Sequence, residues 1–145
     1  MKITYKGDYA LKAILDLSLH YGSSLVTIGE MSRRINAPVK FLEQILLELK
    51  KGGLIESKRG KVGGYLLAKP PSQISIGDVI RLIEGATEPI SCIRDGYAAC
   101  EDVNSCVFRK IWQEISEATA KILDKANFEE LASQVKSSSS FAYSI

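Results

Sequence analysis

The chain has 145 residues, of which 46% are hydrophobic and 25% charged, and its net charge is +2. This size supports one domain with a core of its own, and no apolar stretch approaches the roughly 20 residues of a membrane-spanning helix. No charged-then-apolar signal pattern opens the chain, so we expect a cytoplasmic protein without disulfides. A single histidine, the absence of a Ser/His/Asp set and the absence of a phosphate loop argue against an enzyme.

Residues 1–71 have the pattern of a winged helix-turn-helix domain. A first helix is indicated by apolar residues at three- and four-residue steps after Thr4, a candidate cap. Thr27 and Glu30 form a capping-box pattern before a second, short helix, and a third helix over about 38–51 follows Pro38. Two short apolar runs, 54–58 and 65–68, are joined by a basic, glycine-rich loop and predict a β-hairpin. The predicted fold class is therefore mainly α with a small β-hairpin wing.

Positive charge gathers in this first half of the chain. Residues 33–69 carry nine basic and three acidic side chains, a balance of +6, as expected of a surface that meets phosphates. The exposed start of the third helix should enter the major groove of double-stranded DNA. One such domain covers a half-site, so a homodimer on a palindromic operator is implied. The candidate DNA contacts are Arg33, Pro38, Val39, Lys40, Glu43, Gln44, Lys58, Arg59 and Lys61.

Two alternatives stay open for these polar residues. Glu43 and Gln44 also fit ordinary helix-surface polarity, and Arg33, Arg34 and Lys58 fit phosphate contacts or solvated charge. The same applies to Lys50 and Lys51.

The second half divides into a connecting helix within 72–90, a cysteine loop over 91–106, a long helix and a short final helix within 104–136, and a flexible serine-rich tail over 137–145. Ser75 and Asp78 cap the connecting helix. The long helix carries a near-heptad apolar stripe, which is typical of a seam between two protomers and also of packing on its own domain. The candidate dimerisation residues are Val107, Ile111, Trp112, Ile115, Ala118 and Ile122.

The only three cysteines, Cys92, Cys100 and Cys106, lie within fifteen residues in a polar stretch. Core packing gives thiols little reason to gather there, and an odd number does not suit a disulfide framework. Zinc sites usually contain CxxC pairs, which are absent, whereas the wider spacing favours an iron–sulfur cluster. His20 lies at the far end of the first helix and reads as a surface or capping residue. A fourth ligand is therefore sought among the carboxylates Asp8, Asp95, Glu101 and Asp102.

Several motifs together resemble the Rrf family of bacterial winged-helix transcription regulators, whose branches include the IscR, NsrR and CymR types. They are the opening Met1-Lys2-Ile3-Thr4 with Lys6-Gly7-Asp8-Tyr9-Ala10, then Phe41-Leu42-Glu43-Gln44, Gly53 to Gly60, Gly63 to Leu67, and Ile76 to Ile80 followed by Glu84-Gly85. The resemblance runs from the first residue to about Ala132.

The resemblance implies a homodimer built on the long helix, with the three cysteines holding a cluster near the interface. The IscR type has a histidine ligand three residues past the third cysteine, where this chain has Arg109. The NsrR type uses an aspartate from the partner protomer, and Asp8 stands at the matching position. Asp8 is thus the expected fourth ligand, although a first-turn acid also stabilises a helix amino terminus. The seven-residue gap before Cys100 exceeds the five common in the family's closest forms.

The leading hypothesis is a DNA-binding regulator whose operator affinity depends on an iron–sulfur cluster, of two-iron or four-iron form, sensing iron–sulfur, redox or nitric oxide status. One alternative is a thiol-based or cysteine-metabolism regulator of the same fold without a cluster. Another is a small iron–sulfur redox protein, against which the +6 segment and the missing fourth cysteine argue.

Overall fold

The computed structural model describes residues 1–94 and 96–143, with side chains through residue 138 except at Asp95. The elements in chain order are α1 (Tyr5–Leu19), α2 (Ile28–Ile35), α3 (Val39–Lys51), β1 (Ile55–Lys58), β2 (Gly64–Leu67), the 3₁₀ turn η1 (Pro71–Gln73), α4 (Ile76–Ile83), the 3₁₀ turn η2 (Ser91–Ile93), α5 (Arg109–Lys125) and α6 (Phe128–Tyr143). This is the mainly helical fold with a two-stranded wing that the sequence predicts.

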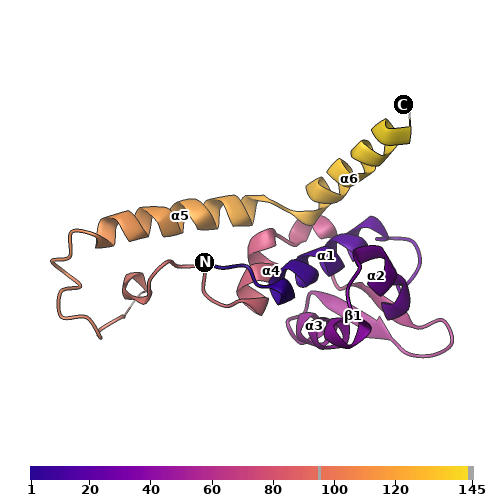
Figure 1. The fold of residues 1–145 in the computed structure, drawn as a ribbon, viewed down its shortest axis with the longest axis horizontal. Helices are drawn as coiled ribbons and strands as arrows, with labels where there is room; N and C mark the ends of the chain where they lie inside the picture. The colour runs from indigo at the N-terminus through magenta and orange to yellow at the C-terminus, as the bar shows by residue number, and fades with distance from the viewer. Residues whose placement is uncertain (95, 144–145) are drawn as a thin grey trace.

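Helix α1 is the centre of the core and packs on α2, α3, α4 and α6 (Figure 1). Its buried stripe of Ala10, Ala13, Ile14 and Leu17 follows the predicted helical period. Helix α3 faces it with four side chains that are completely buried. The core also takes in Phe128 from the start of α6, so residues far apart in sequence close around α1. The buried apolar residues of α3 are Leu42, Ile45, Leu46 and Leu49.

The helix amino termini follow the predicted caps. Thr27 accepts a hydrogen bond from the Glu30 backbone, and the Glu30 carboxylate accepts one from the Thr27 backbone at 3.0 Å. Ser75 and Asp78 form the same reciprocal pair at α4. Each pair satisfies two backbone donors that a helix start leaves unpaired. Such caps fix where a helix begins without help from the rest of the fold.

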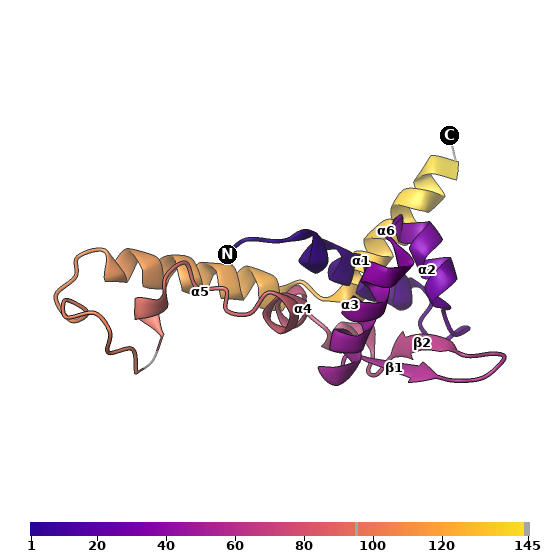
Figure 2. The ribbon, with the colours of Figure 1, turned by 60° about the horizontal axis from the view of Figure 1, so that its bottom comes forward.

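A helix-turn-helix and a wing follow from these local signals. Asn36 ends α2 in the left-handed conformation with φ 53°, and Pro38 then caps α3. Strands β1 and β2 pair antiparallel, with Ile55 opposite Leu67. The hairpin projects from the body beside α3 (Figure 2). The prediction of a winged helix-turn-helix is confirmed.

Helix α5 begins later than the sequence predicts. The expected start was Asn104 or Ser105, but the helix begins at Arg109. It follows a turn in which the backbone N–H of Cys106 donates a 2.8 Å hydrogen bond to the Asp102 carbonyl. Neither serine nor asparagine caps this helix, since Phe108 holds the cap position without a side-chain hydrogen bond. The turn places Cys106 before α5 and not within it. Helix α5 then extends away from the winged helix, with the cysteine segment looping at its amino-terminal end (Figure 1).

The final helix is longer than predicted. A short helix followed by a tail from residue 137 was expected, whereas α6 continues to Tyr143. Phe128 and Ala132 are buried and anchor its first turns, and acidic residues there suit the helix dipole. Once a helix is nucleated, each further residue adds a hydrogen bond, and serine is only a mildly poor helix former. The helix thus continues past residue 137, where serine-rich composition predicted a flexible tail. Among the described residues, no helix has the length and apolar character needed to cross a membrane.

Candidate nucleic-acid interface and cysteine segment

The predicted DNA-contacting residues all lie on the molecular surface. Those of the helix-turn-helix lie near the end of α2, just before α3 and in the first two turns of α3. Those of the wing lie at the end of β1 and in the loop after it. Val39 is 40% exposed although it is apolar. All nine residues are exposed, namely Arg33, Pro38, Val39, Lys40, Glu43, Gln44, Lys58, Arg59 and Lys61. The surface therefore presents the exposed side chains at the start of a helix that a major-groove reader needs.

A groove of about 350 Å³ separates α3 from the wing. Glu43, Leu47 and Lys50 line its helix side, while Lys58 and Arg59 line its wing side. Lys50 is held in place because its ammonium donates a 2.7 Å hydrogen bond to Ser57 on β1. Leu47 is 52% exposed and is not among the candidate DNA contacts predicted from the sequence. Only the spacing of 43, 47 and 50 along one helix face could have indicated it.

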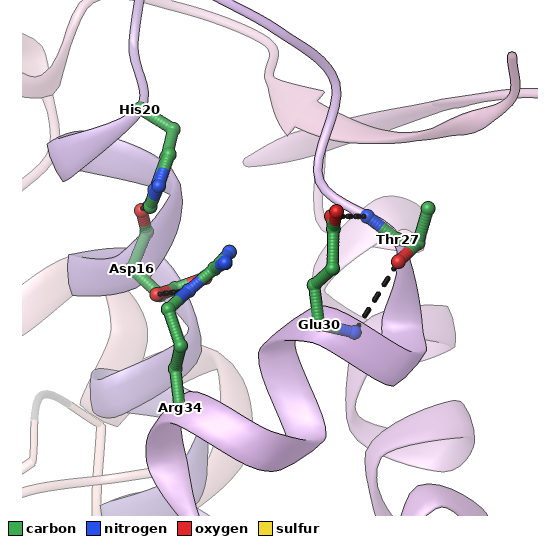
Figure 3. Close-up of polar contacts among 5 residues, drawn as sticks. All are labelled: Asp16, His20, Thr27, Glu30 and Arg34. Atoms are coloured by element: carbon green, nitrogen blue, oxygen red, sulfur yellow. Dashed lines mark hydrogen bonds and ion pairs between the residues drawn. The ribbon is translucent and has the colours of Figure 1, made fainter.

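Arg34 has a different role from its predicted one. Its guanidinium donates two hydrogen bonds, of 2.8 and 3.0 Å, to the carboxylate of Asp16 on α1 (Figure 3). The side chain of Asp16 is 5% exposed and that of Arg34 is 39% exposed. The bond to Asp16 raises the pKa of Arg34. Arg34 therefore ties α2 to α1 and is not solvated charge or a free phosphate contact.

His20 caps the carboxyl end of α1, as expected. Its Nδ1 lies 2.8 Å from the Asp16 carbonyl oxygen, one turn earlier in the helix. It is therefore a local structural residue.

Asp8, the expected fourth ligand, lies in the first turn of α1. Its carboxylate accepts a 2.6 Å hydrogen bond from the Lys12 ammonium, one turn later on the helix. The hydrogen bond raises the pKa of Lys12. About half of each side chain is exposed, so this pair is weak and Asp8 can exchange its partner.

The three cysteines are free thiols on separate parts of the segment. Cys92 lies in η2, where its carbonyl accepts a 3.4 Å hydrogen bond from Arg109 Nε at the start of α5. Cys100 is exposed, and Cys106 is half-buried just before α5.

Within the described part of the chain, no three cysteine, histidine or acidic side chains are close enough together to hold a metal ion. Asp95, another candidate ligand, lies outside the described residues. Thiolates have the right chemistry for an iron–sulfur cluster, but one chain does not bring these thiols together.

The apolar stripe of α5 faces solvent. Val107 is 78% exposed, and along the helix Ile111, Ile115 and Ile122 are 50%, 43% and 69% exposed. Ala118 is also exposed and Trp112 is half-buried, and α5 has no fully buried residue. In the single chain, this stripe therefore does not pack on its own domain.

A carboxylate at the end of α4, before the cysteine segment, ties α4 to the start of α1. Glu84 Oε1 accepts hydrogen bonds from the Thr4 backbone at 2.8 Å and from the Thr4 hydroxyl at 2.6 Å. The hydroxyl bond is the main reason that the pKa of Glu84 is lowered. A Cβ on Gly7 would overlap the same carboxylate, so glycine permits this close approach. We call this group of Thr4, Gly7 and Glu84 the α1–α4 clasp.

The same first two turns of α1 hold the recognition helix. Lys6 forms a 2.5 Å ion pair with Glu48 of α3. Tyr9 packs edge-on against Phe41 of α3, with ring centroids 5.5 Å apart. Asp8 lies between these two contacts in sequence. Thr4 and Gly7 of the clasp, Asp8 and the two residues that contact α3 thus all lie at the amino-terminal end of α1.

Comparisons with known proteins agree with this arrangement. Residues 3–134 match the Rrf2 family model, described as iron-dependent transcriptional regulators. The transcriptional regulator IscR of Yersinia pseudotuberculosis is 35% identical over 131 residues, covering 90% of this chain and 79% of that protein. The structure of CymR, the global cysteine regulator of B. subtilis, matches with a TM-score of 0.77 and 32% identity over 92% of this chain and 98% of that one. T. potens IscR matches with a TM-score of 0.72 and 27% identity, covering 93% and 88%. The chain therefore belongs to the Rrf2 family of DNA-binding transcriptional regulators and is not an enzyme.

Proposed function

We propose that two copies of this chain bind a palindromic DNA operator, and that an iron–sulfur cluster at Cys92, Cys100 and Cys106 controls their affinity for it. The observation that carries the proposal is the position of the cysteine segment. Along the sequence it lies between Glu84 of the α1–α4 clasp and the exposed apolar stripe of α5. The clasp residues Thr4 and Gly7 flank Lys6, which contacts the recognition helix α3. A change in this segment can therefore reach both DNA reading and protomer pairing.

The DNA part of the proposal rests on shape and charge. The exposed polar start of α3 suits a major groove, and the cations of the wing suit the adjoining backbone. Binding should weaken steeply with salt, because each neutralised phosphate releases condensed counterions.

The dimer part rests on the stripe of α5. Four large apolar side chains there are between 43% and 78% exposed, and burying them against a second copy removes this surface from water. The near-heptad spacing suits a helix-to-helix seam. Sedimentation across a range of protein concentrations tests this part, with Ile115→Glu expected to give monomers.

The cluster part rests on donor chemistry and on the likeness to IscR proteins. When bound, a cluster supplies a redox-active and oxygen-labile centre. Because one chain does not gather the three thiols, the segment has to rearrange, or a group from a second copy has to complete the site. Asp8 is the proposed fourth ligand because, among the described residues, its carboxylate pairs with the half-exposed Lys12, a weak surface contact. An oxygen ligand is a weaker match than thiolate, which suits a sensor better than an electron carrier.

The decisive experiment isolates the protein without air and measures its absorbance spectrum, iron and acid-labile sulfide. Its affinity for a duplex selected from a random-sequence pool is then compared before and after cluster removal. Allosteric coupling typically changes affinity by about 5- to 150-fold, and a change in that range is expected. Cys100→Ser should abolish both the cluster and the change, while Ala99→Ser at the adjacent exposed position should preserve both. Protein without iron refutes the cluster, and loaded protein with unchanged affinity refutes the coupling.

A thiol-based regulator without a cluster is the second candidate. It is favoured by the separated, solvent-reachable thiols and by the likeness to CymR. Hydrogen peroxide would take two electrons and two protons from a thiol pair, giving a disulfide and two water molecules. Iron-free protein whose DNA affinity responds reversibly to peroxide and dithiothreitol would select this candidate over the first.

A further inference from the structure

Val62 has the largest exposed fraction, 88%, among the large apolar side chains that the structure describes. Single exposed apolar residues are common, so the position of Val62 is what carries meaning. It lies in the loop between β1 and β2, on the hairpin that projects beside α3 (Figure 2). Its neighbours Arg59 and Lys61 are candidate DNA contacts, whereas Val62 is not among them.

The loop that presents Val62 is tightly built. Gly63 donates a 3.1 Å hydrogen bond to the Gly60 carbonyl, closing a turn around residues 61 and 62. Gly60 has φ +117°, which favours glycine. A Cβ on Gly63 would lie 2.5 Å from the Lys58 carbonyl oxygen, so the backbone there has no room for a side chain. The exposure of Val62 is thus a fixed feature of a constrained turn.

The surroundings of Val62 are positively charged. Residues 57–77 contain four basic side chains and no acidic one. Of the four, Lys58 and Arg59 precede the turn and Lys61 lies within it. A polyanion fits such a tip better than an apolar protein surface does, because burying these cations in an apolar contact is costly. The DNA minor groove matches the pattern: phosphates line both rims, and the groove between them is about 6 Å wide.

We propose that Val62 enters the minor groove next to the major groove read by α3 and helps to select the base pair beneath it. Its methyl groups pack between the deoxyribose walls, while Arg59 and Lys61 meet phosphates on either side. A G·C pair places the guanine 2-amino group on the groove floor, where an A·T pair has none, so valine fits over A·T and is obstructed by G·C. This inference rests on the proposed DNA contact of the wing and adds a specificity-determining residue to it.

The first test uses the full-length protein and a duplex selected from a random-sequence pool. Val62→Ser should bind about fivefold more weakly with an unchanged salt dependence, since only apolar contact is lost. Val62→Thr keeps the shape of the side chain, so its DNA affinity should lie between those of the wild type and Val62→Ser. Lys61→Ala is the matched control and should lower the log–log salt slope by about one. Thermal midpoints of all variants should equal that of the wild type, because these side chains are exposed.

The second test changes the DNA. Each A·T pair flanking the major-groove site is replaced in turn by G·C and by inosine·cytosine, which lacks the 2-amino group. At one flanking position G·C should weaken wild-type binding while inosine·cytosine should not, and Val62→Ser should lose this discrimination.

Equal binding by Val62→Ser and wild type, or inosine·cytosine behaving as G·C does, overturns the role of Val62 and leaves DNA binding intact. Failure of the wild type to enrich any duplex overturns the DNA interface itself.

Discussion

The two partners of the Asp16–Arg34 ion pair differ in burial, so removing Arg34 should cost more stability than removing the charge of Asp16. Arg34→Met leaves a charged group that is 5% exposed without its partner, whereas Asp16→Asn leaves a guanidinium whose side chain is 39% exposed and can be rehydrated. Breaking a fully buried ion pair costs about 3–5 kcal/mol. The cost is lower here because water reaches the Arg34 end of the pair. We expect a destabilisation of about 3 kcal/mol for Arg34→Met and about 1–2 kcal/mol for Asp16→Asn.

Urea unfolding at neutral pH measures both values. With a denaturant slope of about 1–3 kcal/mol per molar, the midpoint should fall by roughly 1–3 M for Arg34→Met and by about half as much for Asp16→Asn. Arg33→Met, at the adjacent exposed position, is the matched control and should change stability by less than about 0.5 kcal/mol. The double variant should be more stable than Arg34→Met alone, because the buried charge is gone. A larger loss for Asp16→Asn, or simple additivity in the double variant, would refute the reasoning.

Three further predictions concern the clasp, the core and the wing. The hydrogen bond from the Thr4 hydroxyl lowers the pKa of Glu84 in the folded protein, so this carboxylate stabilises the fold at pH values above its unfolded pKa of about 4.5. That stabilisation is lost as the pH falls through the folded pKa. In thermal melts across a pH series, Glu84→Gln should flatten the loss of stability at acidic pH, and an unchanged slope would contradict the clasp. Phe128 is 1% exposed, so Phe128→Ala should lower the free energy of unfolding by about 3–5 kcal/mol in urea titrations, and a loss below 1 kcal/mol would place Phe128 outside the core. In Gly64→Ala the new Cβ would lie 2.7 Å from the Val26 carbonyl oxygen, so the melting temperature should fall and amide exchange at the wing should rise, whereas wild-type exchange would refute the contact.

The features that could be predicted from the sequence are those decided within a few residues. The capping boxes at Thr27 and Ser75 each depend on an acid three positions later, so a short window contains the whole interaction. The winged helix followed because these local signals arrive in a characteristic order. The exposed residues of α3 and the wing were identified for the same reason, from helical period and turn composition.

The features that could not be predicted join distant parts of the chain. Arg34 and Asp16 are 18 positions apart, and Glu84 and Thr4 are 80 apart. Nothing in either local sequence distinguishes a charge that finds a partner from one that meets solvent. The arrangement of the cysteines is a different case, because among the described residues no three potential metal ligands come together.

The described part of the stretch from Gly85 to Phe108 buries only Thr87. Its ends are nevertheless fixed, by Glu84 in the clasp and by α5. Lengthening such a loop is cheap, since doubling it costs about 0.6 kcal/mol in closure entropy. Cysteine spacing and loop length can therefore drift over evolutionary time without unfolding the DNA-reading half. The same DNA-reading domain can in this way carry segments of different length and cysteine spacing, each an insertion that the rest of the molecule tolerates.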